Sequence, residues 1–443
     1  MGITRHLSVL WLVALLGGVP ATGATWYVGS RPGDDFTEIQ PAIAAASEGD
    51  LILVRPDKSY APFTLNKALT VRSTTGQFYT RSGGDPTIEN IPSGKTARLA
   101  GFSTDALLRV RWSEGSVVIE DGHVVGGDPF YPFPYRLLEI DDCRFVHLNA
   151  VEFRGVVPVN GATPTALIKS SRVLFTTSAL QGWNGQNSEA DGVAGTPGSP
   201  GLVAMSCDLV IARSSISGGD GGRGFDEDWE FATDGGAGGT ALRLEDGSRA
   251  LLLGCCGDEI RGGHGGDGGQ GYGYAWGAGG DGGHGIEALP GSSAEVSQVL
   301  LKGGKGGDGV PDGKHGSDFV GDVTFRDPPY PTLDMEGDLH PGSSFAVTVR
   351  GEPDWAIVLL ASDTAGWIEL PGRPGPPLTA IPAGTFFLGL YAGLFGPTGE
   401  RTFVLSLLND PVLRGFALTL QMAALPGDGT FVLSNAATRI VGE

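Results

Sequence analysis

Asp141, Asp142, Arg144 and His147 form the densest local group of side chains that could carry out acid–base chemistry. A pair of carboxylates, assisted by a basic residue, can act as general acid and general base when a glycosidic bond is cleaved. His147 also fits an ordinary strand position. The sequence contains no Gly-x-Ser-x-Gly, His-Glu-x-x-His or P-loop motif that would point to another class of active site. These four residues are therefore the catalytic candidates if the protein is an enzyme.

A second set of side chains could bind a metal ion. His264, Asp267, Asp281 and His284 lie in one glycine-rich segment, and they could form a transition-metal site if its two halves are antiparallel neighbours. The nine residues from 303 (GGKGGDGVP) match the calcium nonapeptide pattern and include Asp308. Calcium repeats of that type follow one another nine residues apart, whereas the glycine runs here mostly lie further apart. We expect no cofactor, with calcium as the alternative.

Aromatic side chains recur in the glycine-rich segments and could bind sugars. Indole and phenol rings offer flat apolar faces on which a sugar ring can stack. If successive segments lie side by side, their aromatic residues form one exposed strip. The alternative is that each aromatic residue anchors its own loop against a neighbour. The candidates for a saccharide-binding strip are Trp183, Trp229, Tyr272, Tyr274 and Trp276.

The composition describes a folded, acidic and glycine-rich chain. Of the 443 residues, 74 are glycine and 40% are hydrophobic, which is enough for a sizeable core. The net charge of −20 argues against nucleic acid as a partner and against electrostatic docking to anionic lipid. The same charge favours solubility and cation binding.

Residues 1–24 predict a signal peptide. Arg5 supplies the positive start, an apolar stretch runs from Leu7 to Val19, and small residues at 22–24 suit a cleavage site. The stretch is too short to span a bilayer comfortably, and the sequence contains no second hydrophobic anchor. We therefore expect a secreted, cell-surface or periplasmic protein with no transmembrane anchor in the mature chain.

The cysteines predict buried free thiols at the ends of strands. They are Cys143, Cys207, Cys255 and Cys256. Export permits disulfides, but a bridge between the adjacent Cys255 and Cys256 would be strained. Disulfide bonding remains the alternative.

Regular segments begin directly after the predicted signal peptide. Thr25–Val28 predicts a strand, Phe36–Ser47 a helix with apolar residues at helical spacing, and Leu51–Pro56 a second strand. This opening (YVG…FTEIQPAIAAASEGDLILVRP…Y) resembles that of secreted right-handed parallel β-helix proteins of the pectin-lyase-like group. The resemblance implies that the helix caps the first coil, whose end would otherwise expose unpaired backbone and apolar side chains.

Similar short segments in the middle of the chain predict a solenoid. Leu137–Cys143, Ala166–Ser171, Leu202–Cys207 and Ala241–Asp246 each combine a short strand with a polar turn, and a second strand follows. Their starts are roughly 30 to 45 residues apart, which suits a structural repeat with insertions. Three short strands per repeat fit one coil of a triangular prism, with the coils stacked at about 4.8 Å.

The predicted outer face of the first strands is chemically mixed. Its expected column is Glu139, Ile168, Ala204, Arg243 and Glu287. Lyases and hydrolases of the resembled group gather carboxylates on one outer face, so a mixed column disfavours catalysis. Lys169 falls on an apolar position in this alignment, which indicates either a register shifted by one residue or a distorted coil.

Runs of Gly-Gly-X triplets begin at Gly218, Gly262, Gly279 and Gly303. A three-residue period suits the polyproline II helix, in which X side chains line one edge and glycine edges permit close backbone contact. We predict that these legs pack side by side as a small bundle against one flank of the solenoid. Flexible, solvated loops are the alternative, because ordering glycine costs entropy.

The last third of the sequence has a different character. Residues 326–336 are proline-rich and predict a linker. The segments 345–349, 356–360, 402–405 and 417–421 predict antiparallel strands. We expect residues 337–443 to form a small β-sandwich, loosely similar to those appended to secreted bacterial β-helix proteins.

Together these patterns predict an all-β, exported protein with a capping helix, a β-helix over residues 25–325 and a carboxy-terminal sandwich. We expect it to bind a polysaccharide or a cell-surface polymer, or to have a structural role. The alternative implied by the resemblance is a polysaccharide lyase or glycoside hydrolase.

Overall fold

The computed structural model describes residues 10–11, 23–81, 83–126, 136–155, 163–189, 193–226, 232–254, 257–271, 276–337, 339–362, 365–368, 378–380, 387–410, 413–426 and 431–442. Strand makes up 48% and helix 2% of the structure, which confirms the all-β class. No helix in this described part has the length and apolarity needed to cross a membrane.

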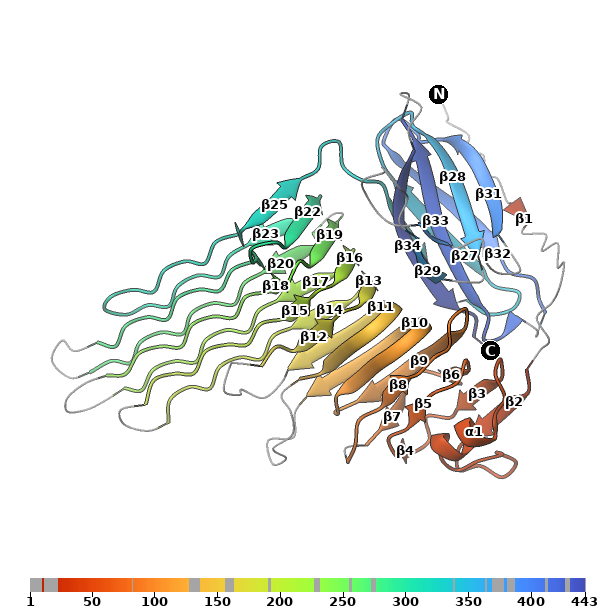
Figure 1. Ribbon diagram of the computed structural model, residues 1–443, viewed down its shortest axis with the longest axis horizontal. Coiled ribbons are helices and arrows are strands. Elements are labelled where there is room, and N and C mark those ends of the chain that lie inside the picture. Colours follow the sequence, from red (N-terminus) through yellow and green to blue (C-terminus); the bar gives the residue numbers. More distant parts are fainter. Residues whose placement is uncertain are drawn as a thin grey trace, which may run out of the picture.

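Residues 25–325 form a coiled body of short parallel strands (Figure 1). Between the first and last coils, each strand pairs with the strand one coil earlier and with the strand one coil later, so that three parallel ladders run along the body. Three strands change ladder at the corners without interruption: β9 (Thr96–Thr104), β10 (Leu108–Gly126) and β11 (Leu138–Gly155).

The remaining strands of the body each belong to one ladder. The first ladder contains β5 (Thr64–Leu65), β8 (Thr87–Glu89), β12 (Ala166–Lys169), β15 (Leu202–Met205), β18 (Leu242–Glu245), β21 (Ile286–Ala288) and β24 (Phe319–Val320). The second contains β2 (Thr25–Val28), β3 (Leu51–Val54), β6 (Thr70–Ser73), β13 (Arg172–Thr176), β16 (Asp208–Ala212), β19 (Arg249–Leu253), β22 (Ser293–Ser297) and β25 (Asp322–Phe325). The third contains β4 (Ser59–Tyr60), β7 (Phe78–Thr80), β14 (Ala179–Gln181), β17 (Ser215–Ser217), β20 (Glu259–Arg261) and β23 (Leu300–Lys302).

The core of the body consists of apolar side chains stacked at equivalent positions of successive coils. In the first ladder, Ile140, Ile168, Ala204 and Leu244 are in register and fully buried. In the second, Leu148, Phe175, Ile211, Leu252 and Val296 form an equivalent buried column. Burial of such columns supplies the main favourable free energy of folding.

This register corrects the predicted outer column. Ile168 and Ala204 point inward, and the outward residues beside Glu139, Arg243 and Glu287 are Leu167 and Val203. Lys169 pairs with Asp141 and Met205 and is partly exposed, so the alignment was shifted by one residue and this coil is regular.

The first corner of each coil, between the first and second ladders, uses a left-handed backbone residue. Asp142, Ser170 and Ser206 have φ values of 49°, 46° and 56°. Where a serine follows this corner, its hydroxyl accepts a hydrogen bond from the backbone of the preceding coil. Ser171 accepts from the Cys143 N–H at 2.9 Å, and Ser248, in a later coil, accepts from the Cys207 N–H at 3.1 Å. These hydrogen bonds satisfy polar groups that the turn would otherwise leave unpaired.

Cys143 and Cys207 lie at these corners as buried free thiols, as predicted. Burial raises the pKa of Cys143 to about 12 and that of Cys207 to about 11, which disfavours the reactive thiolate. Cys255 and Cys256 lie outside the described residues.

Helix α1 (Ile39–Ala45) covers the first coil, within the longer helix predicted for this segment. Ile39, Ala42 and Ile43 are buried against the core, so its apolar face replaces a missing coil. The strand predicted at residues 25–28 is confirmed, and the strand predicted at residues 51–56 forms over Leu51–Val54.

The carboxy-terminal unit (residues 332–442) contains antiparallel sheets, as predicted for these strands. Residues 332–336 of the predicted linker form a strand of this unit, and Tyr330 is buried, so the connection is shorter than expected. One four-stranded sheet has the order β1 (Leu10–Trp11), β32 (Glu400–Ser406), β27 (Ser344–Arg350) and β26 (Thr332–Glu336), in which β1, from outside this range, pairs in parallel with β32 and the other pairs are antiparallel. The other has the order β31 (Phe387–Leu394), β28 (Ala356–Ser362), β33 (Ala417–Leu425) and β34 (Val432–Ile440), and β29 (Ala365–Ile368) pairs with β30 (Leu378–Ala380).

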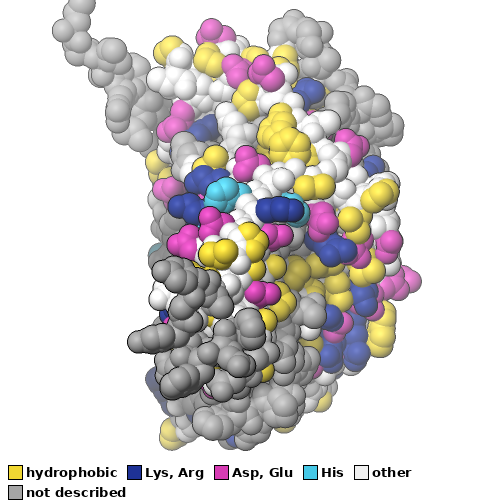
Figure 2. Space-filling view, turned by 90° about the vertical axis from the view of Figure 1, so that its left-hand side faces the viewer, with side chains coloured by type: hydrophobic (Ala, Val, Ile, Leu, Met, Phe, Trp, Pro, Cys, Tyr) yellow, Lys and Arg dark blue, Asp and Glu magenta, His cyan; other side chains and the backbone are white. Residues whose placement is uncertain are grey.

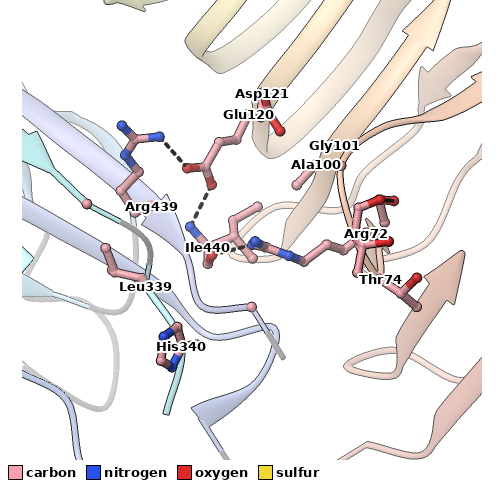
Figure 3. Close-up of a pocket in the computed structure, with 15 residues that line it drawn as sticks. Arg72, Thr74, Ala100, Gly101, Glu120, Asp121, Leu339, His340, Arg439 and Ile440 are labelled. Atoms are coloured by element: carbon pink, nitrogen blue, oxygen red, sulfur yellow. Dashed lines mark hydrogen bonds and ion pairs between the residues drawn. The ribbon is translucent and has the colours of Figure 1, made fainter. Parts of the chain in front are cut away.

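The carboxy-terminal unit lies alongside the second ladder of the body (Figure 1). Phe145, Leu174 and Val210 pack against Ala436 and Ile440 across an apolar junction. A polar hollow of ≈ 460 Å³ borders this junction and is drawn in Figure 3. Its buried carboxylate, Glu120, accepts from the Ile440 N–H at 2.6 Å and pairs with Arg439 at 3.2 Å. Burial raises the pKa of Glu120. These bonds join the two units, so the hollow is a structural junction.

Candidate functional site

A shallow groove of ≈ 780 Å³ follows the first corner of several coils. The left-handed residues at this corner direct their side chains outward, so Trp112, Asp142, Ser170 and Ser206 of successive coils line it. Charged side chains from the start of the second ladder border them: Glu114, Arg144, Arg172 and Asp208.

Trp112 gives the groove its aromatic surface. It is 50% exposed, although tryptophan is usually buried, and the Arg111 guanidinium stacks 4.2 Å from its ring centroid. Both Trp112 and Glu114 were missed in the sequence, because they are recognisable only once the corners are located. The two serines supply hydroxyl groups, and the indole supplies a flat apolar surface. This combination suits a sugar ring, which has both hydroxyl groups and apolar faces.

Two arginines and three carboxylates line the groove: Arg144 and Arg172, with Glu114, Asp142 and Asp208. Arg144 donates to the Ser93 hydroxyl at 3.2 Å, which holds its guanidinium at the edge of the groove. Arg172 pairs with Asp208 at 3.6 Å, and Asp208 also pairs with Arg249 at 2.7 Å. The Arg172–Asp208–Arg249 group therefore carries excess positive charge, in a chain with a net charge of −20. A guanidinium group can bind a carboxylate or a hydroxyl group of a ligand.

The structure separates the predicted catalytic candidates. Asp142 and Arg144 line the groove, and Asp141 lies on the outward face of the first ladder, where it pairs in register with Arg111. His147 is fully buried between the body and the carboxy-terminal unit, where Thr438 and Thr176 bond its two ring nitrogens at 3.1 and 2.8 Å. Burial lowers the pKa of His147 to about 3. His147 is therefore inaccessible to a substrate.

Arginines neutralise the carboxylates on the outer face of the first ladder. Arg109 pairs with Asp85 and with Glu139, each at 3.1 Å, and Arg111 pairs with Glu89 at 2.8 Å. Arg243 lies 2.7 Å from Glu245. A neighbouring guanidinium group therefore already engages each of these carboxylates, and burial raises the pKa of Asp85.

The glycine-rich segments form an ordered bundle, as predicted. We name it the glycine bundle; its described parts are residues 182–189, 193–201, 218–226, 232–241, 262–271, 276–285 and 303–318. Each layer leaves the body after the third ladder and returns before the first. Figure 1 shows that the legs project away from the body, so the predicted packing against its flank is wrong.

Backbone hydrogen bonds recur every third residue within the glycine bundle. Gly263, Gly266 and Gly269 donate at 2.8–2.9 Å to carbonyl oxygens of the previous layer's return leg. Gly262, Gly265 and Gly268 donate at 2.8–2.9 Å to the outgoing leg of the next layer. The interval equals the period of a polyproline II helix. Each leg is therefore bonded to neighbours through its backbone.

Only glycine fits the inner positions of the bundle. A Cβ atom added to Gly266 would collide with the carbonyl oxygen of Gly222, and one added to Gly280 with that of Gly236. The first layer, which contains no Gly-Gly-X run, has a neighbour on one face and carries one glycine in three: Gly182, Gly185, Gly195, Gly198 and Gly201. The number of glycines per triplet thus follows the number of packed faces.

The predicted metal ligands are used as hydrogen-bond acceptors inside the glycine bundle. His264 Nδ1 accepts from the Lys305 N–H at 2.8 Å, and His284 Nδ1 from the Ser317 N–H at 3.0 Å. Asp267 and Asp281 accept in the same way from Asp308 and Lys314, at 2.9 and 2.7 Å. Within the described residues, no three His, Cys, Asp or Glu side chains gather as a metal site. The set is dispersed because each side chain bonds the next layer.

Two of the five residues predicted to form an exposed aromatic strip, Trp183 and Trp276, lie in the described part of the structure. Trp183 is 4% exposed and packs on Gly126 and Gly155, so it anchors the first layer and cannot belong to an exposed strip. Trp276 is 45% exposed. Trp229, Tyr272 and Tyr274 lie outside the described residues.

The chain matches no protein-family model, and no curated protein or solved structure is significantly similar to it.

Proposed function

We propose that this protein is an exported, non-catalytic module that binds a polysaccharide along the first-corner groove. In this proposal the coiled body is a right-handed parallel β-helix, the carboxy-terminal unit is a β-sandwich, and residues 1–24 direct export. The exposed indole of Trp112 carries the proposal, because it lies in a groove bordered by serine hydroxyls and by Arg144. A succession of equivalent corner residues suits a polymer better than a small molecule.

The test is retention of the full chain on immobilised neutral and acidic polysaccharides. Trp112→Ala should weaken binding at least about tenfold, because a buried aromatic contact is worth roughly 2 kcal/mol in an interface. Trp276→Ala is the matched control: it removes an exposed indole from the glycine bundle and should leave binding unchanged. If Trp112→Ala binds like the parent on every retained polysaccharide, the groove is not the site. Loss of binding in Trp276→Ala alone would instead support the aromatic strip.

The acidic residues of the same groove support a second candidate function, a polysaccharide lyase or hydrolase. Glu114, Asp142 and Asp208 are carboxylates, and Arg144 is a neighbouring cation. Product formation on the same polysaccharides would establish this function if Asp142→Asn abolished it and preserved binding. A polysaccharide that is bound but not cleaved supports the binding role.

A further inference from the structure

Three of the four ends of the stacked structure are closed by the chain's own residues. Helix α1 covers the first coil of the body. In the first layer of the glycine bundle, Ser199 and Thr196 side chains accept from the Trp183 and Gln186 N–H groups, each at 2.7 Å. In the last layer, the side chains of Asp318, His315 and Asp312 accept from Gly303, Gly306 and Gly309 N–H at 2.9–3.1 Å. Those N–H groups would otherwise be available to a further layer.

The last coil of the body is the exception. Its strands are β23, β24 and β25, and each pairs with a strand of the preceding coil. Among the described strands, none pairs with their opposite edges. Figure 1 shows that the carboxy-terminal unit lies beside the body rather than over this end. An open strand edge is a site at which another chain can add.

Apolar side chains gather at this open end. Of the eleven exposed large apolar residues in the described part, four lie on the strands of this coil: Leu300, Phe319, Val320 and Phe325. Phe325 is 59% exposed, and its ring centroid lies 5.5 Å from that of Phe319. Exposed apolar residues are normal when scattered, whereas a cluster marks an interaction surface.

The charge of the last coil indicates what covers it. Between residues 300 and 326, which comprise the last coil and the last layer of the glycine bundle, four basic residues balance four acidic ones, whereas the whole chain has a net charge of −20. Side chains of both signs are interspersed on the end of the molecule that carries the glycine bundle (Figure 2). A face that meets its own copy must be complementary to itself, and a neutral mixture of charges meets that requirement, whereas an acidic face would repel its copy. The balancing residues are Lys302, Lys305, Lys314 and Arg326 with Asp308, Asp312, Asp318 and Asp322.

We propose that the last coil binds the last coil of a second copy of this chain across a two-fold axis. The two-fold places the open edges of β25 side by side in antiparallel orientation, which permits backbone pairing. It also places the Phe319 and Phe325 rings of both copies in one buried patch. Head-to-tail stacking is disfavoured, because α1 occupies the opposite end of the body.

Sedimentation velocity of the full chain tests this proposal. Between roughly 1 and 200 µM, the parent should convert from monomer to dimer and to nothing larger, as expected of a modest interface. Phe325→Glu should weaken the dimer at least about tenfold, because it buries an unpaired charge. Leu394→Glu is the control, since Leu394 is 55% exposed in the carboxy-terminal unit, and it should dimerise like the parent.

A monomeric parent across this range would overturn the proposal, as would equal dimerisation of Phe325→Glu and the parent. A ladder of species beyond the dimer would contradict the two-fold. Hydrogen exchange of the parent is a measurement independent of any variant. Amides of residues 319–325 should exchange more slowly at high than at low protein concentration, and concentration-independent exchange would overturn the proposal.

Discussion

The coiled body and the glycine bundle follow the same chain path but are held together differently. In the body, apolar columns such as Leu148–Phe175–Ile211 fill the interior, and backbone bonds join the coils. In the bundle there is no interior to fill, and legs approach until the backbones touch, as Gly266 does against Gly222. Body stability therefore depends on the presence of large side chains, and bundle stability on their absence. The two regions should respond in opposite ways to a change of side-chain size.

The largest expected effect is in the body. Phe175→Ala removes a fully buried ring from the second-ladder column and should lower the free energy of unfolding by about 3–5 kcal/mol. Phe175→Leu, which retains most of the volume, should cost much less. Denaturant unfolding measures both variants. Equal losses would show that packing volume does not control this column.

The reverse substitution should damage the bundle. Gly266→Ala places a methyl group against the Gly222 carbonyl and should cost about 2–4 kcal/mol, because the backbone must shift. Lys305→Ala alters an X position in the next layer and should cost less than about 0.5 kcal/mol. If Gly266→Ala is as mild as Lys305→Ala, the legs are not in close contact.

Acidification should loosen the junction between the body and the carboxy-terminal unit. Burial lowers the pKa of His147 to about 3, whereas the unfolded chain takes up that proton near pH 6.5. The stability contributed by neutral His147 is thus complete above about pH 6.5 and declines as the pH falls toward its folded pKa. At about pH 5 the loss should be about 2 kcal/mol relative to neutral pH. His147→Gln cannot take up this proton, so its stability should fall less steeply than that of the parent. Parallel pH profiles would contradict this role.

The smallest effect concerns the hydrogen bonds between layers. His264→Ala leaves the Lys305 N–H without its acceptor and should cost about 1–2 kcal/mol. His264→Asn should recover most of that loss, because shorter side chains already make this bond in the same column. Asn184 accepts from the Asp220 N–H, and Asp220 accepts from the His264 N–H. An Asn variant no better than the Ala variant would mean that the ring, and not its acceptor atom, matters.

Sequence reasoning located the strands because burial imposes a strong pattern on them. Leu202–Met205 and Asp208–Ala212 could be predicted from apolar runs bounded by polar turns. The register was harder: in Ala166-Leu167-Ile168 all three residues are apolar, so nothing in their chemistry distinguishes the inward from the outward face. The three-residue glycine period likewise predicted the bundle, whose pairings are local and regular.

The groove could not be predicted in the same way. Trp112 becomes a surface residue only because the corner backbone at that residue is left-handed, with φ of 52°, and no sequence pattern announced this corner. His147 looked like a catalytic candidate because Asp142 and Arg144 are nearby in sequence, but the strand carries it beneath the carboxy-terminal unit. The replacement of glycine by Asp312, His315 and Asp318 was a visible signal for the end of the bundle.

Hydrogen exchange across residues 262–270 and 277–285 tests most directly whether backbone pairing orders the glycine bundle. The hydrogen bonds between legs predict that the glycine amides of these legs exchange at least about 100-fold more slowly than in an unstructured peptide. Exchange of every amide in these legs at the unstructured rate, while the strands of the body stay protected, would contradict the account.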